Sequence, residues 1–129
     1  MSYLLEIPAH LDDRGSLYVI EEMLDFDATR VYFITNAAGT TRGMHRHKIT
    51  KQALFVPKGS CVVKVQEKDS REIKSYILDV PQKLLYLDPE DFHWMLDFSQ
   101  DCVLMVLASH NYDKADYVSE PHFALTESK

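Results

Sequence analysis

The sequence predicts an all-β fold, a single domain built as an antiparallel sandwich or barrel. Eight or so short runs of β-branched and aromatic residues follow one another along the chain, and clusters of turn residues separate them. Several runs alternate apolar and polar residues with a period of two, which is typical of strands with one buried face. A length of 129 residues suits one domain. A jelly roll fits best, because such folds bind ligands between their two sheets.

The expected strands begin after a polar turn at 12–16. The first two span 17–21 and 30–35, and a break at 36–39 separates them from a strand that carries two histidines. Turns rich in Pro, Gly and Asp then punctuate the rest of the chain. The run at 102–108 is apolar throughout, which predicts burial on both faces. One helical turn is expected at 113–118. The remaining strands are expected at 52–56, 61–66, 73–78, 84–87, 92–98 and 102–108.

The stretch at 39–59 holds the clearest functional signal. His45 and His47 stand two residues apart, so both side chains point to the same face of an extended strand. At a rise of about 3.3 Å per residue, their Cβ atoms would lie about 7 Å apart. This spacing suits two imidazoles that flank one small substrate or share one metal ion.

Charge around these histidines is one-sided. The chain as a whole carries a net charge of -6. From 40 to 66, however, the sequence contains no Asp or Glu and several cations. This local excess of positive charge, beside a titratable pair, indicates an anionic ligand. The cations are Arg42, Arg46, Lys48, Lys51, Lys58 and Lys64.

Composition excludes several other classes of protein. No apolar run approaches the roughly 20 residues that span a bilayer, and the N-terminal stretch lacks the pattern of a signal peptide. A pI near 5.4 argues against nucleic acid as the main partner. Cys61 and Cys102 lie in apolar runs, which favours buried, reduced thiols. We therefore expect a cytoplasmic protein without membrane or nucleic-acid partners.

The spacing of glycines and histidines resembles the first motif of the cupin superfamily. Gly39 precedes the His45-x-His47 pair, and Gly59 follows it at the distance that this motif has. A faint echo of the second cupin motif ends at His93, which follows a Pro-containing turn. The resemblance implies a cupin-type jelly roll with these histidines at its ligand site.

One element of the cupin motif is missing. The family normally places a glutamate three or four residues after the second histidine, and this chain has Lys51 and Gln52 there. A divalent ion in such a site needs an anionic oxygen beside its imidazoles, and a lysine adds repulsion. A site made by His45, His47 and His93 alone stays open as an alternative. The expectation is a protein without metal.

A narrower resemblance covers nearly the whole chain. Six collinear blocks look like the sugar 3,4-ketoisomerases that act on dTDP-4-oxo-6-deoxy-glucose, whose hallmark is an Arg-Gly-x-His-x-His-Lys run. The resemblance implies an isomerase without cofactor or metal, which forms homodimers by exchanging N-terminal strands and serves deoxy sugar biosynthesis for surface polysaccharides or secondary metabolites. The blocks are DDRGSL (12–17), RVYFI (30–34), RGMHRHK (42–48), KGSCVV (58–63), DFSQDCVLMVLAS (97–109) and YDKADY (112–117).

Roles for individual residues follow from this resemblance. It makes His47 the main base, with His45 as a proton shuttle. An arginine suits the diphosphate because its guanidinium donates paired hydrogen bonds to phosphate oxygens. The residues expected to line the pocket or contact the substrate are Tyr32, Arg42, Arg14, Gln52 and His93.

Structural alternatives exist for some of these residues. His93 lies in an aromatic run, where a buried histidine with satisfied hydrogen bonds is equally expected. Tyr32 has the alternative of a core tyrosine with a bonded hydroxyl, and Arg14 that of pairing with Asp12 or Asp13.

Three rival functions remain at this point. A 3,5-epimerase on the same class of substrate needs the same base chemistry, and a sugar-nucleotide binding module needs none. A metal-dependent cupin oxygenase would need the metal that the motif disfavours. The sequence also leaves open the configuration at C4 of the product and the nucleotide base.

Overall fold

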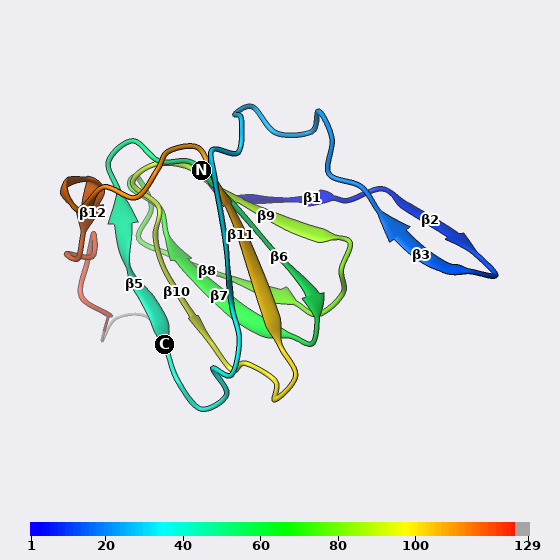
Figure 1. Ribbon diagram of the computed structural model, residues 1–129. Coiled ribbons are helices and arrows are strands. Elements are labelled where there is room, and N and C mark those ends of the chain that lie inside the picture. The colour runs from blue at the N-terminus through cyan, green and yellow to red at the C-terminus, as the bar shows by residue number, and fades with distance from the viewer. Residues whose placement is uncertain (126–129) are drawn as a thin grey trace.

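A computed structural model of the chain describes residues 1–125. Their backbone consists almost entirely of short strands joined by turns (Figure 1). No helix of the described residues is long and apolar enough to cross a membrane. The strands are β1 (Tyr3–Glu6), β2 (Ala9–Asp12), β3 (Gly15–Tyr18), β4 (Arg30–Ile34), β5 (Arg42–His47), β6 (Gln52–Lys58), β7 (Cys61–Gln66), β8 (Ile73–Leu78), β9 (Lys83–Leu87), β10 (Phe92–Leu96), β11 (Val103–Ala108) and β12 (Tyr117–Val118), with a 3₁₀ turn, η1 (Lys114–Asp116), before the last.

Two five-stranded antiparallel sheets form the body of the protein. One sheet has the order β1-β9-β6-β11-β4, and the other has the order β12-β5-β10-β7-β8. Consecutive strands often belong to different sheets, so the chain crosses repeatedly between the two layers, as in a jelly roll. The all-β, cupin-type prediction is confirmed. The strand after the 3₁₀ turn, β12, closes the second sheet beside β5 (Figure 1).

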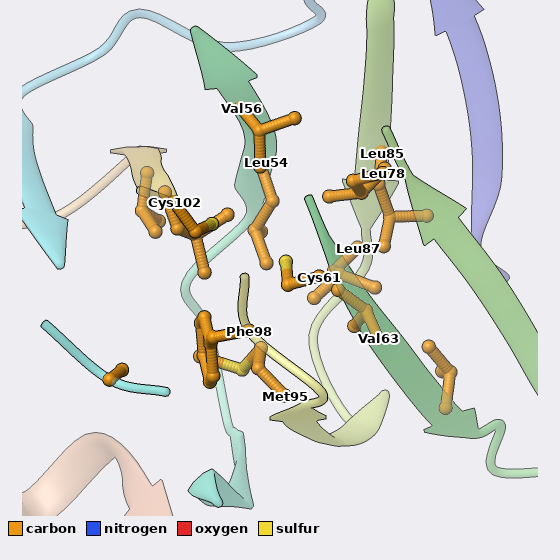
Figure 2. Packing of buried hydrophobic residues seen from close by; sticks show 14 residues of the cluster. Leu54, Val56, Cys61, Val63, Leu78, Leu85, Leu87, Met95, Phe98 and Cys102 are labelled. Carbon is orange, nitrogen blue, oxygen red and sulfur yellow. The ribbon is translucent and has the colours of Figure 1, made fainter. Parts of the chain in front are cut away.

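The hydrophobic core lies between the two sheets. Strand β7 shows why: Cys61, Val63 and Val65 alternate with half-buried residues and are at most 1% exposed. Leu54 and Val56 of β6 pack toward them from the opposite sheet (Figure 2). The period-two pattern in the sequence is thus the pattern of side chains that face this core.

The outer face of the first sheet carries a second, smaller apolar cluster. Ile7, Ala53 and Leu84 are buried there under the segment that connects β3 to β4. This cover is incomplete over β11, where Val103, Met105 and Leu107 are only half-buried. The expectation that the apolar run at 102–108 is buried on both faces is therefore wrong. Its outward residues are apolar because they pack partly against the cover, not because a full layer lies over them.

Strands β2 and β3 form a hairpin of their own. They pair only with each other, and the hairpin projects away from the two sheets (Figure 1). Leu11 and Leu17 on this hairpin are 71% and 61% exposed. An isolated two-stranded hairpin is marginally stable in water, and these leucines have no cover within the described chain.

Candidate active site

The candidate site continues the core at one end of the sandwich. On β6, Gln52 precedes Leu54 on the same face, and on β10 His93 precedes Met95 in the same way. Both polar residues are 2% exposed, and Leu54 and Met95 belong to the core cluster. Polar groups therefore replace apolar ones at this end of the sandwich.

Three imidazole rings meet in this region. The ring centroid of His45 lies 5.1 Å from that of His47 and 5.0 Å from that of His93, while the rings of His47 and His93 are 6.3 Å apart. His45 is half-buried, and the other two are almost fully buried. The pair two residues apart on β5 thus shares a face as predicted, and its neighbour strand supplies the third ring.

A local irregularity in β5 orients His45. The pairing of β5 with β10 shifts between His93 and Trp94, and Gly43 at this point has φ of +92°. A Cβ on Gly43 would lie 3.0 Å from the carbonyl oxygen of His93, so the close approach of the two strands needs glycine. The carbonyl oxygen of Gly43 lies 3.0 Å from Nδ1 of His45. A carbonyl only accepts, so Nδ1 of His45 carries the proton.

The ring of His47 is fixed by a carboxylate. Its Nδ1 lies 2.8 Å from Oδ2 of Asp116, and both side chains are about 5% exposed or less. Its Nε2 is buried and has no hydrogen-bond partner among residues 1–125. Burial lowers the pKa of His47, and the hydrogen bond and charge of Asp116 act in the opposite direction.

The third ring is held neutral. Nδ1 of His93 donates to the carbonyl oxygen of Asp91 at 3.0 Å. Burial, with the neighbouring His45 as a smaller cause, lowers the pKa of His93 to about 3. Burial and the charge of His47 also lower the pKa of His45. His93 is thus buried with its Nδ1 bonded, as the structural alternative expects, and it also belongs to the cluster of imidazoles.

An arginine and two tyrosines border the imidazoles. The ring of Tyr117 lies 4.9 Å from that of His45 and 4.4 Å from that of His47, centroid to centroid. Its hydroxyl accepts a hydrogen bond of 3.2 Å from Arg30. The guanidinium of Arg30 also lies 4.4 Å over the ring of Tyr32. A positive charge is thus held beside the imidazoles by aromatic faces.

Tyr32 and Gln52 contact each other beside this arginine. The amide of Gln52 donates to the hydroxyl of Tyr32 at 3.1 Å, across β11, which separates their strands. Burial and then the nearby Tyr117 raise the pKa of Tyr32, whereas the charges of Arg30 and Arg42 lower it. The structure therefore brings Tyr32, Gln52 and the charge of Arg42 to the region of the imidazoles, as the sequence predicts.

Arg14 is the one predicted pocket residue that lies elsewhere in this chain. It sits at the tip of the projecting β2–β3 hairpin, and its side chain is 86% exposed. Its guanidinium pairs with the carboxylate of Asp12 at 2.6 Å. The alternative stated from the sequence, pairing within the turn, is the contact that the chain itself makes.

The residues present do not fit the metal of the cupin motif. Lys51 forms an ion pair with Asp25 at 3.0 Å, and Gln52 donates its amide to Tyr32. Neither position supplies an anionic ligand. Within residues 1–125, no group of three or more His, Cys, Asp or Glu side chains is arranged to hold a metal ion.

Sequence reasoning missed three residues of this site, namely Arg30, Asp116 and Tyr117. Asp116 is 69 positions from its partner His47, and no local pattern marks it. The block YDKADY is one of those that carry the family resemblance, and its last two residues are Asp116 and Tyr117. Likewise Arg30 opens the block RVYFI. A signal was present in both blocks, but only as family likeness.

Known proteins resemble this chain over nearly its whole length. The FdtA family, described as WxcM-like, C-terminal, matches residues 1–127. The chain belongs to the FdtA family. Over 113 residues it is 44% identical to TDP-4-oxo-6-deoxy-alpha-D-glucose-3,4-oxoisomerase of Aneurinibacillus thermoaerophilus, an alignment that covers 85% of this chain and 80% of that relative.

Solved structures of isomerases resemble this FdtA-family chain in fold. A 3,4-ketoisomerase from Helicobacter canadensis has a TM-score of 0.87 at 32% identity, covering 92% of this chain and 90% of that one. The sugar 3,4-ketoisomerase QdtA of Thermoanaerobacterium thermosaccharolyticum, in complex with TDP, has a TM-score of 0.87 at 37% identity and covers 92% of this chain and 88% of that one.

Proposed function

We propose that this FdtA-family protein is a sugar 3,4-ketoisomerase that converts dTDP-4-oxo-6-deoxy-glucose to a dTDP-3-oxo-6-deoxyhexose. The observation that carries the proposal is the cluster of three imidazoles, neutral and bonded through Nδ1, in a protein 44% identical to a 3,4-oxoisomerase. With Nδ1 occupied, each ring presents Nε2 as a lone pair that accepts a proton. The same relative and the TDP complex of QdtA support the TDP-linked substrate.

The reaction is a proton transfer within the sugar. A base removes the hydrogen at C3 as a proton, its bonding electrons form a C3–C4 double bond, and the electrons of the carbonyl move onto O4. C4 of this enediolate then takes up a proton, O4 takes up another proton and becomes a hydroxyl, and O3 gives up its proton and becomes the new carbonyl oxygen. Electrons are only redistributed, so the reaction needs no redox cofactor. Groups that accept and return protons near neutral pH are what it requires.

We assign the base to His47 and a proton shuttle to His45. Nε2 of His47 is buried and unpartnered among the described residues, and a buried acceptor in that condition is costly unless a ligand uses it. His45 is half-buried and lies between His47 and His93. It is therefore the ring that an entering sugar meets first, which suits a shuttle.

The remaining residues of the site bind the substrate in this proposal. We propose that Tyr32, Gln52 and His93 line the sugar pocket, and that Arg42 contacts the diphosphate. His93 stays neutral because its pKa is far below the physiological range, so its free Nε2 acts as an acceptor of a sugar hydroxyl. Metal plays no part in this proposal, because neither Lys51 nor Gln52 supplies the carboxylate that the cupin motif needs.

We further propose a homodimer in which N-terminal strands are exchanged. The projecting β2–β3 hairpin, with Leu11 and Leu17 exposed on it, supports this proposal because such a hairpin needs a second surface. Exchange would carry Arg14 to the site of the partner. The match over residues 1–127 supports one ketoisomerase domain, and the free, buried thiols of Cys61 and Cys102 support a cytoplasmic location.

Proton NMR of dTDP-4-oxo-6-deoxy-glucose with the protein in D2O tests the function. We expect a 3-oxo product that carries deuterium at C4, and its coupling constants give the C4 configuration. Exchange at C3 and C5 with the ketone still at C4 would establish the 3,5-epimerase instead. No change in the sugar, with TDP bound, would leave a binding module.

Two variants separate the roles of the histidines in the same experiment. His47→Asn should abolish exchange at C3 as well as product, because no base remains. His45→Asn should stop product formation while slow exchange at C3 continues. The opposite pattern would make His45 the base and overturn our assignment.

A further inference from the structure

Asp116 reaches the imidazole cluster from the far end of the chain. It lies in η1, just before β12, and Tyr117 of β12 pairs with His47 of β5. This pairing places the Asp116 carboxylate behind the His47 ring, where Oδ2 is 2.8 Å from Nδ1. Asp116 itself is only 6% exposed. A buried carboxylate needs partners that compensate for its lost hydration.

Those partners are all hydrogen-bond donors. The backbone N–H groups of Lys48 and Ile49 donate to Oδ1 at 2.9 and 2.7 Å, and the hydroxyl of Thr50 donates to Oδ2. Although burial by itself raises the pKa of Asp116, the bonds from Thr50, Ile49 and His47 bring it down to about 2. The group is therefore an anion with a fixed orientation, and it accepts from His47.

This contact decides the tautomer of His47. An ionised carboxylate has no proton to give, so the proton between the two groups belongs to Nδ1 of the ring. Nε2 must then carry a lone pair while the ring is neutral. The same atom is the one buried without a hydrogen-bond partner in the described chain. The contact with Asp116 thus leaves Nε2 of His47 unprotonated and able to act as a base.

The other two imidazoles bond through Nδ1 to a different kind of acceptor. Nδ1 of His45 donates to the carbonyl of Gly43, and Nδ1 of His93 donates to the carbonyl of Asp91. A carbonyl is neutral and stabilises an imidazolium less than an anion does. Of the three rings, His47 is the one with a carboxylate within hydrogen-bond distance in the described chain. A proton that enters the cluster is best held there.

We propose that Asp116 is a positioning residue for His47: it fixes the Nδ1–H tautomer and stabilises the imidazolium that forms when His47 accepts the substrate proton. The proposal rests on the proposed ketoisomerase function for its catalytic part. Its structural part, the tautomer, holds or fails without any substrate. In the serine-protease triad, the corresponding Asp→Asn change lowers kcat by about 10⁴ through the wrong tautomer.

The test compares Asp116→Asn with Asp113→Asn. Asp113 caps the same η1 turn by accepting from the N–H of Ala115 at 3.0 Å, and its exposed side chain has no part in the imidazole cluster. Both variants lose one charge from the same segment. We expect Asp116→Asn to lower kcat by about 10²–10⁴ with affinity for TDP changed less than about threefold, and Asp113→Asn to keep wild-type kcat.

Nitrogen NMR of the histidine side chains supplies a readout that a merely structural role does not move. In the wild type, His47 should show protonated Nδ1 and unprotonated Nε2. In Asp116→Asn the N–H of the side-chain amide donates to Nδ1 of the ring, so the ring proton should move from Nδ1 to Nε2. The acidic limb of kcat/KM should also shift to lower pH, because the imidazolium loses its anion.

Each outcome decides the proposal. A wild-type His47 protonated at Nε2 overturns it, even if Asp116→Asn does not fold. A folded Asp116→Asn protein with kcat within threefold of the wild type also overturns it. A wild type with the expected tautomer but no isomerase activity rejects the proposed function and leaves the Asp116–His47 arrangement in place.

Discussion

His45 on β5 lies directly across from His93 on β10, and their ring centroids are 5.0 Å apart. After burial, the neighbouring His45 is the largest cause that lowers the pKa of His93, because two imidazolium ions at this distance repel each other. Burial and the charge of His47 lower the pKa of His45. The folded protein therefore keeps both rings neutral under conditions in which free histidine is protonated. This relationship has a consequence for stability as well as for chemistry.

The contribution of His93 to the free energy of unfolding should fall as the pH is lowered from about 6.5 toward 3. The folded chain holds the pKa of His93 at about 3, whereas the unfolded chain has the ordinary value of about 6.5. Between these values the unfolded chain binds a proton that the folded chain does not, so acid favours unfolding by up to about 1.4 kcal/mol per pH unit for this group. Urea denaturation at several pH values measures the slope.

His93→Gln is the control for this slope. Glutamine keeps a donor for the carbonyl of Asp91 but does not titrate. Asp91 acts in the opposite direction, since burial raises its pKa to about 6 and its protonation stabilises the folded chain as the pH falls. This contribution is present in both proteins and cancels in the difference. Equal slopes for the wild type and the variant would contradict the prediction.

Gly43→Ala should damage both stability and activity. The residue has φ of +92°, and a Cβ would lie 3.0–3.1 Å from the His93 carbonyl oxygen, the Met95 sulfur and the Trp94 Cα. We expect a loss of about 1–2 kcal/mol from the backbone conformation and a further 1–3 kcal/mol or so from overpacking. Turnover should fall as well, because the carbonyl of Gly43 orients His45.

Gly39→Ala is a matched control for this substitution. Gly39 also has a positive φ, +82°, but a Cβ there meets nothing within 4 Å. Gly39→Ala should lose only the stability that the positive φ costs an alanine, and it should leave kcat unchanged. Thermal unfolding and kcat of both variants separate strain of the backbone from crowding at the β5–β10 bulge. Equal losses in the two variants would show that crowding is unimportant.

The sequence predicts the central strands well and the N-terminal ones poorly, for a physical reason. At 61–66 and 73–78 the predicted bounds are those of β7 and β8, because one face of each strand is buried and the alternation is visible locally. Strand β1 carries no such pattern. It exists because Tyr3 pairs with Tyr86 of β9, a partner that lies far along the chain.

The same distinction applies to the site. The His45–His47 pair is predictable because side chains two residues apart on a strand point to the same face. The Asp116–His47 contact is not, since it depends on β12 pairing with β5 across 69 positions of sequence. Arg30 beside Tyr117 depends on the packing of two sheets. Long-range pairing, rather than residue type, limits how much of the site can be predicted from the sequence.

Activity should survive removal of divalent metal. The site offers imidazoles without the carboxylate that would complete a cupin metal site, since Lys51 and Gln52 occupy the corresponding positions. Elemental analysis of the purified protein should find far less than one metal ion per chain, and dialysis against EDTA should leave kcat unchanged. Loss of activity with EDTA, restored by one divalent ion, would establish the metal-dependent alternative.

The projecting hairpin should hold the proposed dimer together. Leu11 and Leu17 lie on opposite faces of the β2–β3 ribbon, since Leu11 pairs with Ser16 and Leu17 with His10. Both are largely exposed in the chain, so a partner would cover both faces. We expect Leu11→Asp and Leu17→Asp to sediment as monomers at concentrations at which the wild type is a dimer. Dimers of unchanged stability would contradict strand exchange through this hairpin.

Mixing two impaired variants shows whether Arg14 serves the site of the partner. If strands are exchanged, Arg14→Ala and His47→Asn damage each site through different chains. A mixed dimer then has one site with both changes and one site with neither, so a refolded equimolar mixture should regain about a quarter of wild-type activity from statistical assembly. If Arg14 acts within its own chain, or only pairs with Asp12 as it does in the hairpin, the mixture should show no more than the average of the two variants. The same mixture made in the Leu11→Asp background should regain nothing, because restoration requires the dimer.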